Sequence, residues 1–196
     1  MKFFRTTIVA LLAAMLAGTA AAQQPGETTV ILVRHAEKAA PASAMDGDPA
    51  LSPAGEQRAR DLEALLRGRH VDAIVTTQFK RTRMTAQPLA DSLHLVPEVV
   101  QAGAPDHVAA VAELIRTRHA GQTVLVVGHS NTVTAIIAAL GGPALGDLCD
   151  SAYGNLFTLV IPASGAPRLN HAHYGAADPP AAGCENGIQS AHPPHP

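Results

Sequence analysis

The sequence predicts an α/β domain: a doubly wound, mainly parallel sheet with helices on both faces. Short segments that are apolar throughout alternate with segments whose apolar residues recur at helical spacing. Strands that are apolar throughout are typical of parallel sheets, because both of their faces are buried. Their alternation with amphipathic helices indicates that helices cover both sides of the sheet.

The expected elements follow one another in regular order along the chain. The apolar segments predict strands at residues 29–33, 71–75, 93–100, 124–127 and 156–161. Helical spacing relates the members of three apolar groups: Ala59, Leu62 and Leu66; Val108, Val111 and Ile115; and Val133, Ile136, Ile137 and Leu140. A further helix is expected after Phe79. Pro88 predicts a kink or a late start there, because proline lacks the N–H of a helical hydrogen bond.

The first 22 residues have the layout of a secretory signal peptide. Lys2 and Arg5 form a positive region, residues 8–16 are apolar, and alanines precede Gln23. The apolar run is shorter than the roughly 20 residues of a membrane-spanning helix. We therefore expect an exported protein, periplasmic or secreted, that begins near Gln23 and has no membrane span after the leader is removed.

The remaining chain divides into a domain at residues 23–174 and a tail at residues 175–196 that is rich in Pro, Ala and His. The tail has no hydrophobic periodicity, which predicts that it is disordered or lightly docked. Without Lys2 and Arg5, 12 basic side chains oppose 16 acidic ones, giving a formal charge of −4. A mildly acidic chain without a basic stripe argues against nucleic acid as a partner.

The two cysteines, Cys149 and Cys184, both lie in the last third of the chain. In an oxidising compartment such a pair can form a disulfide that fastens the C-terminal segment to the domain. Two unpaired thiols are the alternative.

Polar side chains of unusual character follow three of the expected strands. Arg34 and His35 come directly after the first strand, and "GHSNT" follows the fourth. Ligands of open α/β sheets bind beyond the carboxyl ends of the strands, so these sequences predict one site. Lys80, Arg81 and Arg83 open the helix after the second strand, where cations oppose the helix dipole unless an anion binds. Arg81 is expected to point inward, and the other two to face water.

One interpretation of "VLVVGHSNTVTAII" is the nucleophile elbow of a serine hydrolase. Ser130 then occupies the central position of G-x-S-x-G, although Thr132 stands where the final glycine belongs. A later acid and histidine would have to complete the triad. The residues that could loosely serve are Asp150, Asp178, His171 and His173.

The other interpretation is a phosphate pocket. His129 is then the functional residue, while Ser130 and Asn131 supply backbone donors and a side-chain cap for the next helix. A neutral, rigidly held histidine can attack phosphorus, and an adjacent arginine can bind the phosphoryl oxygens.

Four sequence elements in order favour the second interpretation. "LVRHAEK", "LSPAGEQRARDL", "TTQFKRTRMTA" and "VLVVGHSNTV" lie between residues 30 and 140. Together they resemble the histidine phosphatase superfamily, in its phosphoglycerate-mutase-like branch 1. Ala36 stands where the Arg-His-Gly motif of that family has glycine.

The resemblance implies a metal-independent hydrolysis of phosphomonoesters without a cofactor. His35 would form a phosphohistidine intermediate, and Arg34, Arg81 and His129 would complete the cationic pocket. Lys38, Ser130 and Asn131 are the residues expected to contact a small phosphorylated substrate. Mutases of this branch carry long insertions over the site, and the short chain favours hydrolysis over transfer within the substrate.

The general acid that protonates the leaving oxygen has three candidates. The resemblance favours Asp106, which also suits a helix N-cap, and its rivals are Glu98 and Glu37. Two other function classes remain: a serine esterase that uses Ser130, and a non-catalytic phosphate or phosphosugar binder. His70, His94, His107 and His119 are expected to face water. His171 and His173 are expected on a polar strand face, and His192 and His195 at a solvated terminus, with a metal site as the alternative.

Overall fold

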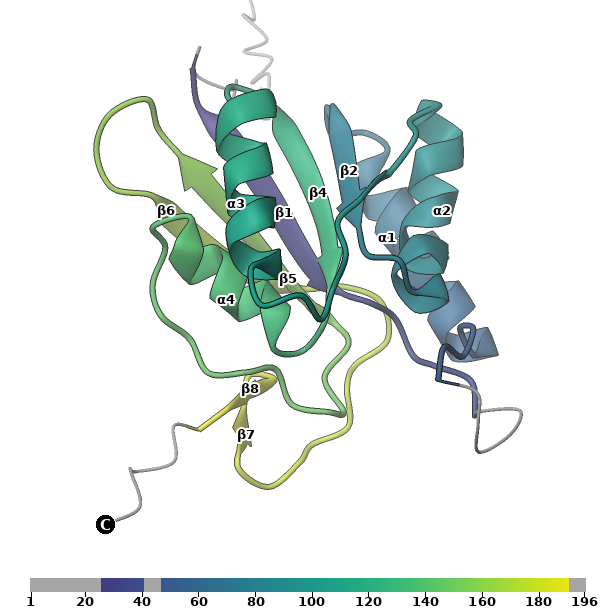
Figure 1. The fold of residues 1–196 in the computed structure, drawn as a ribbon. Coiled ribbons are helices and arrows are strands. Elements are labelled where there is room, and N and C mark those ends of the chain that lie inside the picture. Colours follow the sequence, from purple (N-terminus) through teal and green to yellow (C-terminus); the bar gives the residue numbers. More distant parts are fainter. Residues whose placement is uncertain (1–25, 41–46, 191–196) are drawn as a thin grey trace, which may run out of the picture.

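A computed structural model of the chain describes residues 26–40 and 47–190; the expected leader at residues 1–22 lies outside the described residues. Six strands form one sheet in the order β3-β2-β4-β1-β5-β6 (Figure 1). They are β1 (Thr28–Arg34), β2 (Ala73–Thr76), β3 (Glu98–Val99), β4 (Thr123–Gly128), β5 (Asn155–Ile161) and β6 (Arg168–His173). The first four are parallel, and β5 is antiparallel to both β1 and β6. The expected mainly parallel sheet is confirmed.

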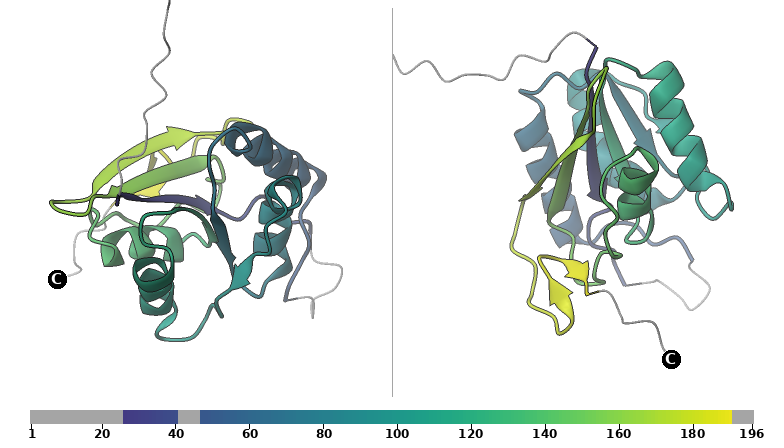
Figure 2. Two further views of the ribbon diagram at one scale, coloured as in Figure 1. Left: turned by 90° about the horizontal axis from the view of Figure 1, so that it is seen from above. Right: turned by 90° about the vertical axis from the view of Figure 1, so that its left-hand side faces the viewer.

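Helices cover both faces of the sheet, which confirms the doubly wound arrangement (Figure 2). The described residues form four helices, which are α1 (Pro53–Leu66), α2 (Lys80–Leu93), α3 (His107–Arg118) and α4 (Thr132–Ala139). Side chains of α1 and α2 pack in one buried cluster with Ile31, and side chains of α3 and α4 pack in another with Leu32. Neighbouring residues of β1 thus enter opposite cores. None of the helices in the described part of the chain has the length and apolar character of a membrane span.

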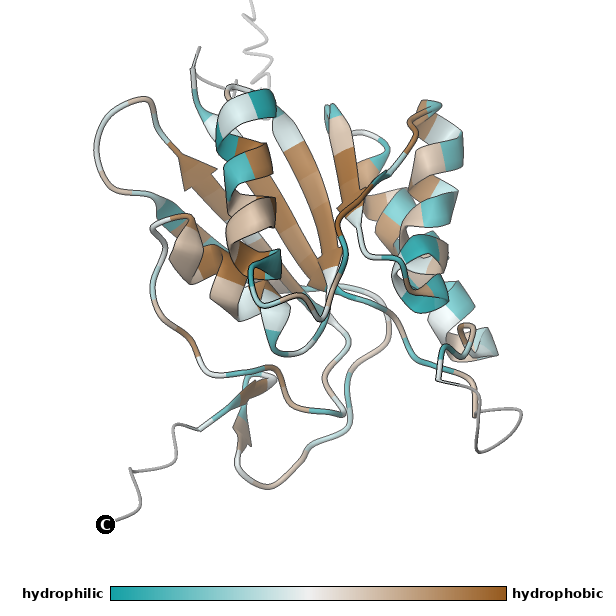
Figure 3. Cartoon of the chain, viewed as in Figure 1, coloured by the Kyte–Doolittle hydropathy of each residue, from teal (hydrophilic) through white to brown (hydrophobic). Residues whose placement is uncertain are grey.

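The hydrophobic residues concentrate on the central strands and on the helix faces that meet them (Figure 3). Each fully buried large aliphatic side chain, such as Ile31 or Leu125, contributes about 1.5–3 kcal/mol. Burial on both faces holds β1 and β4 firmly, so the polar residues that follow them have a rigid base.

The region between α2 and α3 differs from expectation. The predicted strand at 93–100 is wrong in extent, because α2 continues to Leu93 and His94 ends the helix in the left-handed conformation, at φ 54°. Only Glu98 and Val99 form a strand. The late start at Pro88 is also wrong, since α2 begins at Lys80 and contains the proline.

The C-terminal segment (residues 175–190) is docked rather than disordered. Cys149 and Cys184 form a disulfide. The short strands β7 (Cys184–Glu185) and β8 (Ile188–Gln189) pair with each other, and Leu148 forms a β-bridge with Ile188. Few of these residues are apolar, so hydrophobic periodicity carried no trace of this docking.

Arg58 of α1 joins three parts of the fold. Its side chain is only 3% exposed, and its Nε and Nη2 atoms donate to the Glu37 carboxylate at 2.8–3.0 Å. Nη1 donates to the carbonyl of Tyr174 at 2.9 Å, and Asp178 lies 3.5 Å from Nη2. A buried guanidinium with two carboxylates connects the end of β1 to the C-terminal segment.

Arg58→Met should lower the free energy of unfolding by about 3 kcal/mol, because the partly buried Glu37 carboxylate loses its partner. Arg60→Met on the same helix is the matched control, since Arg60 is exposed and, among the described residues, its side chain bonds only to Gln57. Urea unfolding of both variants measures the difference. Equal stability of the two proteins would contradict a structural role for Arg58.

Candidate active site

The parallel pairing of β1 with β4 assembles the site. Arg34 lies opposite Gly128 in the register, and the His35 N–H donates to the Gly128 carbonyl at 2.9 Å. The residue that follows each of these strands is a histidine, His35 after β1 and His129 after β4. The ring centroids of His35 and His129 are 5.4 Å apart in an edge-to-face arrangement. Two segments almost a hundred residues apart in the sequence thus meet at the carboxyl ends of neighbouring parallel strands.

His35 is buried and held in one tautomer. Its Nδ1 lies 2.8 Å from the carbonyl oxygen of Ala36, and because a carbonyl only accepts, Nδ1 carries the proton. Nε2 has no hydrogen-bond partner among the described residues and keeps its lone pair. Burial lowers the pKa of His35 to about 3, and nearby Arg34 and His129 also lower it. The imidazole is therefore neutral at physiological pH.

Arg34 is oriented by the loop that precedes β5. Its Nη1 lies 2.8–3.3 Å from three carbonyl oxygens, which belong to Cys149, Asp150 and Ala152. Its guanidinium carbon lies 4.3 Å from the centroid of the Tyr153 ring. The Nε atom is buried and has no hydrogen-bond partner within the described part of the chain. One side of the guanidinium is thus anchored to protein, and the Nε–Nη2 edge remains for an anion.

Arg81 lies in the first turn of α2, and its side chain is 15% exposed, whereas Lys80 and Arg83 are exposed. Its Nη1 lies 3.6 Å from Asp48, whose carboxylate also accepts from the Lys80 N–H at 2.9 Å. The Phe79 ring lies 4.0 Å from the guanidinium carbon. Like that of Arg34, the Nε of Arg81 is buried and finds no hydrogen-bond partner among the residues described.

His129 is connected to the end of β2. Its Nε2 forms a 3.1 Å hydrogen bond with the Thr77 hydroxyl, which in turn bonds to Thr82 of α2 at 2.9 Å. Burial lowers the pKa of His129 to about 4, with further lowering by Arg81 and His107. The pocket thus joins two arginines to two neutral imidazoles.

The predicted helix cap differs in detail. Asn131 holds the N-cap position of α4, but its side chain makes no capping bond. Thr132 instead accepts the His129 N–H through its hydroxyl at 2.9 Å. Ser130 contributes its carbonyl, which accepts from Leu148. Lys38 is exposed near the pocket and lowers the pKa of His129.

The three candidate acids lie in different surroundings. Glu37 is bound to Arg58 through both oxygens. Glu98 of β3 forms ion pairs at 2.8 Å with Arg118 and His119, which lie at the C-terminal end of α3. Asp106 is exposed, occupies the N-cap of α3 and makes no side-chain capping bond there. Both rivals are thus held in ion pairs, and Asp106 forms none with the residues that the structure describes.

The residues required for a serine triad lie elsewhere. His171 bonds to Asn155 at 2.7 Å and stacks on Phe157. Asp178 accepts backbone N–H groups. Within residues 26–40 and 47–190, the Ser130 hydroxyl has no hydrogen bond to a histidine.

Sequence reasoning missed several groups around the pocket. Phe79 and Tyr153 each stack on an arginine, and Asp48 reaches Arg81 from the loop before α1. His107 and His119 were expected to face water, which is wrong: they are 5% and 7% exposed. His107 bonds to the Gln101 carbonyl instead.

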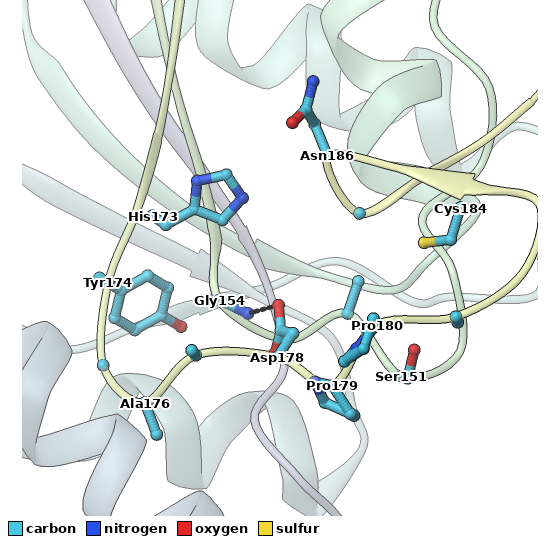
Figure 4. Close-up of a pocket in the computed structure, with 15 residues that line it drawn as sticks. Ser151, Gly154, His173, Tyr174, Ala176, Asp178, Pro179, Pro180, Cys184 and Asn186 are labelled. Atoms are coloured by element: carbon cyan, nitrogen blue, oxygen red, sulfur yellow. Dashed lines mark hydrogen bonds between the residues drawn. The ribbon is translucent and has the colours of Figure 1, made fainter.

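A separate cavity of about 420 Å³ lies between the core and the C-terminal segment (Figure 4). It is lined by His173, Tyr174, Asp178 and Asn186, among others. Ala152 and Gly154 also line it, so the loop that holds Arg34 forms one of its walls. Neither His35 nor His129 lines this cavity.

Comparisons with known proteins agree with the fold and the motifs. The model of the histidine phosphatase superfamily (branch 1) matches residues 30–103. Phosphoserine phosphatase 1 of Hydrogenobacter thermophilus is 29% identical, over 63% of this chain and 82% of its own length. The structure of the protein histidine phosphatase SixA complexed with tungstate has a TM-score of 0.60 and 22% identity, covering 74% of this chain and 96% of that one.

A mycobacterial glucosyl-3-phosphoglycerate phosphatase structure has a TM-score of 0.54 and 20% identity, and covers 77% of this chain and all of that one. The region matched by the family model contains both Arg34-His35 and Arg81, and β4 delivers His129 to the same pocket. The family-model match and the phosphatase relatives together support a phosphatase of the histidine phosphatase type.

Proposed function

We propose that this phosphatase hydrolyses small phosphomonoesters through a phosphohistidine intermediate on His35, without a metal ion. One observation carries the proposal: a neutral imidazole, with Nδ1 bound to a carbonyl and Nε2 unbonded, lies among cationic groups. Such an imidazole has its lone pair aimed and available at neutral pH.

Two steps would convert substrate to product. His35 Nε2 forms a bond to phosphorus while the bond from phosphorus to the leaving oxygen breaks, and that oxygen takes a proton from an acid. Water then attacks the phosphohistidine, the P–N bond breaks, and inorganic phosphate leaves with His35 neutral again. Arg34, Arg81 and His129 would stabilise the charge on the phosphoryl oxygens.

Asp106 is our candidate for the acid, because its two rivals already hold ion pairs. Lys38, Ser130 and Asn131 would contact the substrate at the rim of the pocket. The similarity to a phosphoserine phosphatase supports a small phosphorylated substrate. The tungstate bound by SixA supports an oxyanion in the pocket, since tungstate has the shape of phosphate.

We also propose that the protein acts outside the cytoplasm, in the periplasm or secreted. The sequence of residues 1–22 supports this proposal. The bridge between Cys149 and Cys184 supports it too, because disulfides persist in oxidising compartments.

His35→Ala should abolish hydrolysis of an aryl phosphate, and excess EDTA should leave the wild-type rate unchanged. Ser130→Ala is the matched control and should retain most of the activity. Initial rates of the three proteins, each checked for folding by circular dichroism, decide the matter. Activity of His35→Ala, or loss of an aryl esterase activity in Ser130→Ala, would refute the proposal.

The pocket imidazoles should remain neutral when the pH falls from 8 to 5. Burial lowers the pKa of His35 to about 3 and that of His129 to about 4, so protonation begins only well below pH 5. Proton NMR of the free protein measures this, with signals assigned through His35→Asn and His129→Asn. Titration of either ring near pH 6.5 would contradict the burial argument.

Asp106→Asn should slow the release of poor leaving groups more than that of good ones. An alkoxide needs a proton as it departs, whereas a nitrophenolate hardly does. The rate for an alkyl phosphate should therefore fall at least about tenfold more than the rate for nitrophenyl phosphate. Equal losses on both substrates would exclude Asp106 as the acid.

A further inference from the structure

The loop that orients Arg34 rests on the C-terminal segment. We call residues 147–154 the Arg34 loop; it contains no helix and no strand. Three of its carbonyl groups face Arg34, as described above. Three of its N–H groups, those of Cys149, Tyr153 and Gly154, donate to the C-terminal segment. The Arg34 loop thus contacts Arg34 through its carbonyl groups and the C-terminal segment through its N–H groups.

Asp178 holds the end of the Arg34 loop. Its Oδ1 accepts the N–H of Tyr153 and its Oδ2 accepts the N–H of Gly154, both at 2.9 Å. Figure 4 shows the carboxylate reaching the backbone of Gly154. Its side chain is 15% exposed, and Arg58 lies 3.5 Å from it. A carboxylate on two successive N–H groups fixes the direction of the peptide planes on either side of Tyr153.

The start of the Arg34 loop is held by the disulfide and by backbone bonds. Cys149, whose carbonyl oxygen makes the 2.8 Å bond to Arg34, is itself linked to Cys184. The Cys149 N–H donates to Gly187 at 2.9 Å, and the Gln189 N–H donates to Asp147 at 2.8 Å. Both ends of the loop are therefore attached to the C-terminal segment, and the arginine-binding carbonyls lie between them.

We propose that Asp178 and the Cys149–Cys184 bridge are positioning residues that set the phosphate-binding geometry of Arg34. The inference rests on the proposed function, in which Arg34 grips the phosphoryl group. Irregular backbone without these attachments has many conformations, and ordering it at the moment of binding would weaken affinity. The bidentate grip of a guanidinium depends on its orientation, so loss of the support weakens anion binding before it weakens the fold.

A double-mutant cycle tests the link between Asp178 and Arg34. Tungstate is the probe, and its Kd is measured by titration calorimetry in wild type, Asp178→Ala, Arg34→Lys and the double variant. Asp178→Ala should weaken tungstate binding about tenfold in the wild-type background and very little in the Arg34→Lys background. Asp178→Asn, which retains one carbonyl oxygen, should fall between wild type and Asp178→Ala.

Asp72→Ala is the matched control. The Asp72 carboxylate also accepts a backbone N–H, that of Thr123 at 2.8 Å. Thr123 begins β4, so this contact lies at the end of the strand opposite to the site. Its loss should leave the tungstate Kd and the KM for an aryl phosphate unchanged. For Asp178→Ala, KM should rise together with the tungstate Kd, while thermal unfolding of each variant reports general damage separately.

The bridge is tested in the folded protein by reduction. A phosphine reductant should weaken tungstate binding by wild type about tenfold, and reoxidation should restore it. The Cys149→Ser/Cys184→Ser variant should bind like the reduced wild type and ignore the reductant. This arm needs no substitution at Asp178, so it holds even where Asp178→Ala does not fold.

Three results would overturn the inference. The first is an equal effect of Asp178→Ala in both Arg34 backgrounds, and the second is an Asp178→Ala protein that binds tungstate like wild type. The third is a reduced, folded wild type with unchanged affinity. Each of these leaves hydrolysis by wild type intact, and so differs from failure of the proposed function. A wild type that neither binds tungstate nor hydrolyses aryl phosphates overturns both.

Discussion

The site depends on bringing positive charge together in a small, poorly hydrated volume. Burial lowers the pKa of the Arg34 and Arg81 guanidinium groups from their usual value, which reports how unfavourable their charged forms are there. The surrounding structure offsets this in two ways. Carbonyl oxygens and a carboxylate bind the outer nitrogens of the arginines, and an aromatic ring lies against each guanidinium. The two histidines add no charge, because they remain neutral.

The support extends outward from these groups in layers. Arg34 is held by a loop, the loop by Asp178 and a disulfide, and Asp178 lies beside Arg58. Arg58 returns to Glu37, which is two residues from His35. These polar contacts, buried or partly buried, thus begin beside His35 and return to the same strand end. Because the arginines are bound on their other sides, the pocket is held in place before any anion arrives.

Much of this arrangement is predictable from the sequence, and the reason is periodicity. Residues 30–33 and 124–127 are apolar throughout, which predicts two buried parallel strands. The polar sequences that follow them must then meet at the carboxyl ends of these strands, which the structure confirms. The strand expected at residues 93–100 is too long because Leu93 and Leu95 fit a strand or a helix end equally well. Tertiary packing selects the helix end at Leu93. Tyr153, Asp178 and Arg58 escaped prediction since polar contacts between distant segments leave no periodic signal. The disulfide was one of two stated alternatives for the cysteines.

The strand order has a consequence for how the chain reaches this structure. β1 is the first strand in the described part of the chain, yet it lies in the interior of the sheet, and both of its neighbours come from the second half of the chain. The two ladder edges of β1 therefore have no native partner until residues 123–161 have been synthesised, although Ile31 can already pack against α1 and α2. Closing such long-range contacts is slow, and an unpaired hydrophobic strand is exposed to association in the meantime. Contact order alone thus predicts that this fold forms late and needs protection from aggregation until β4 and β5 arrive.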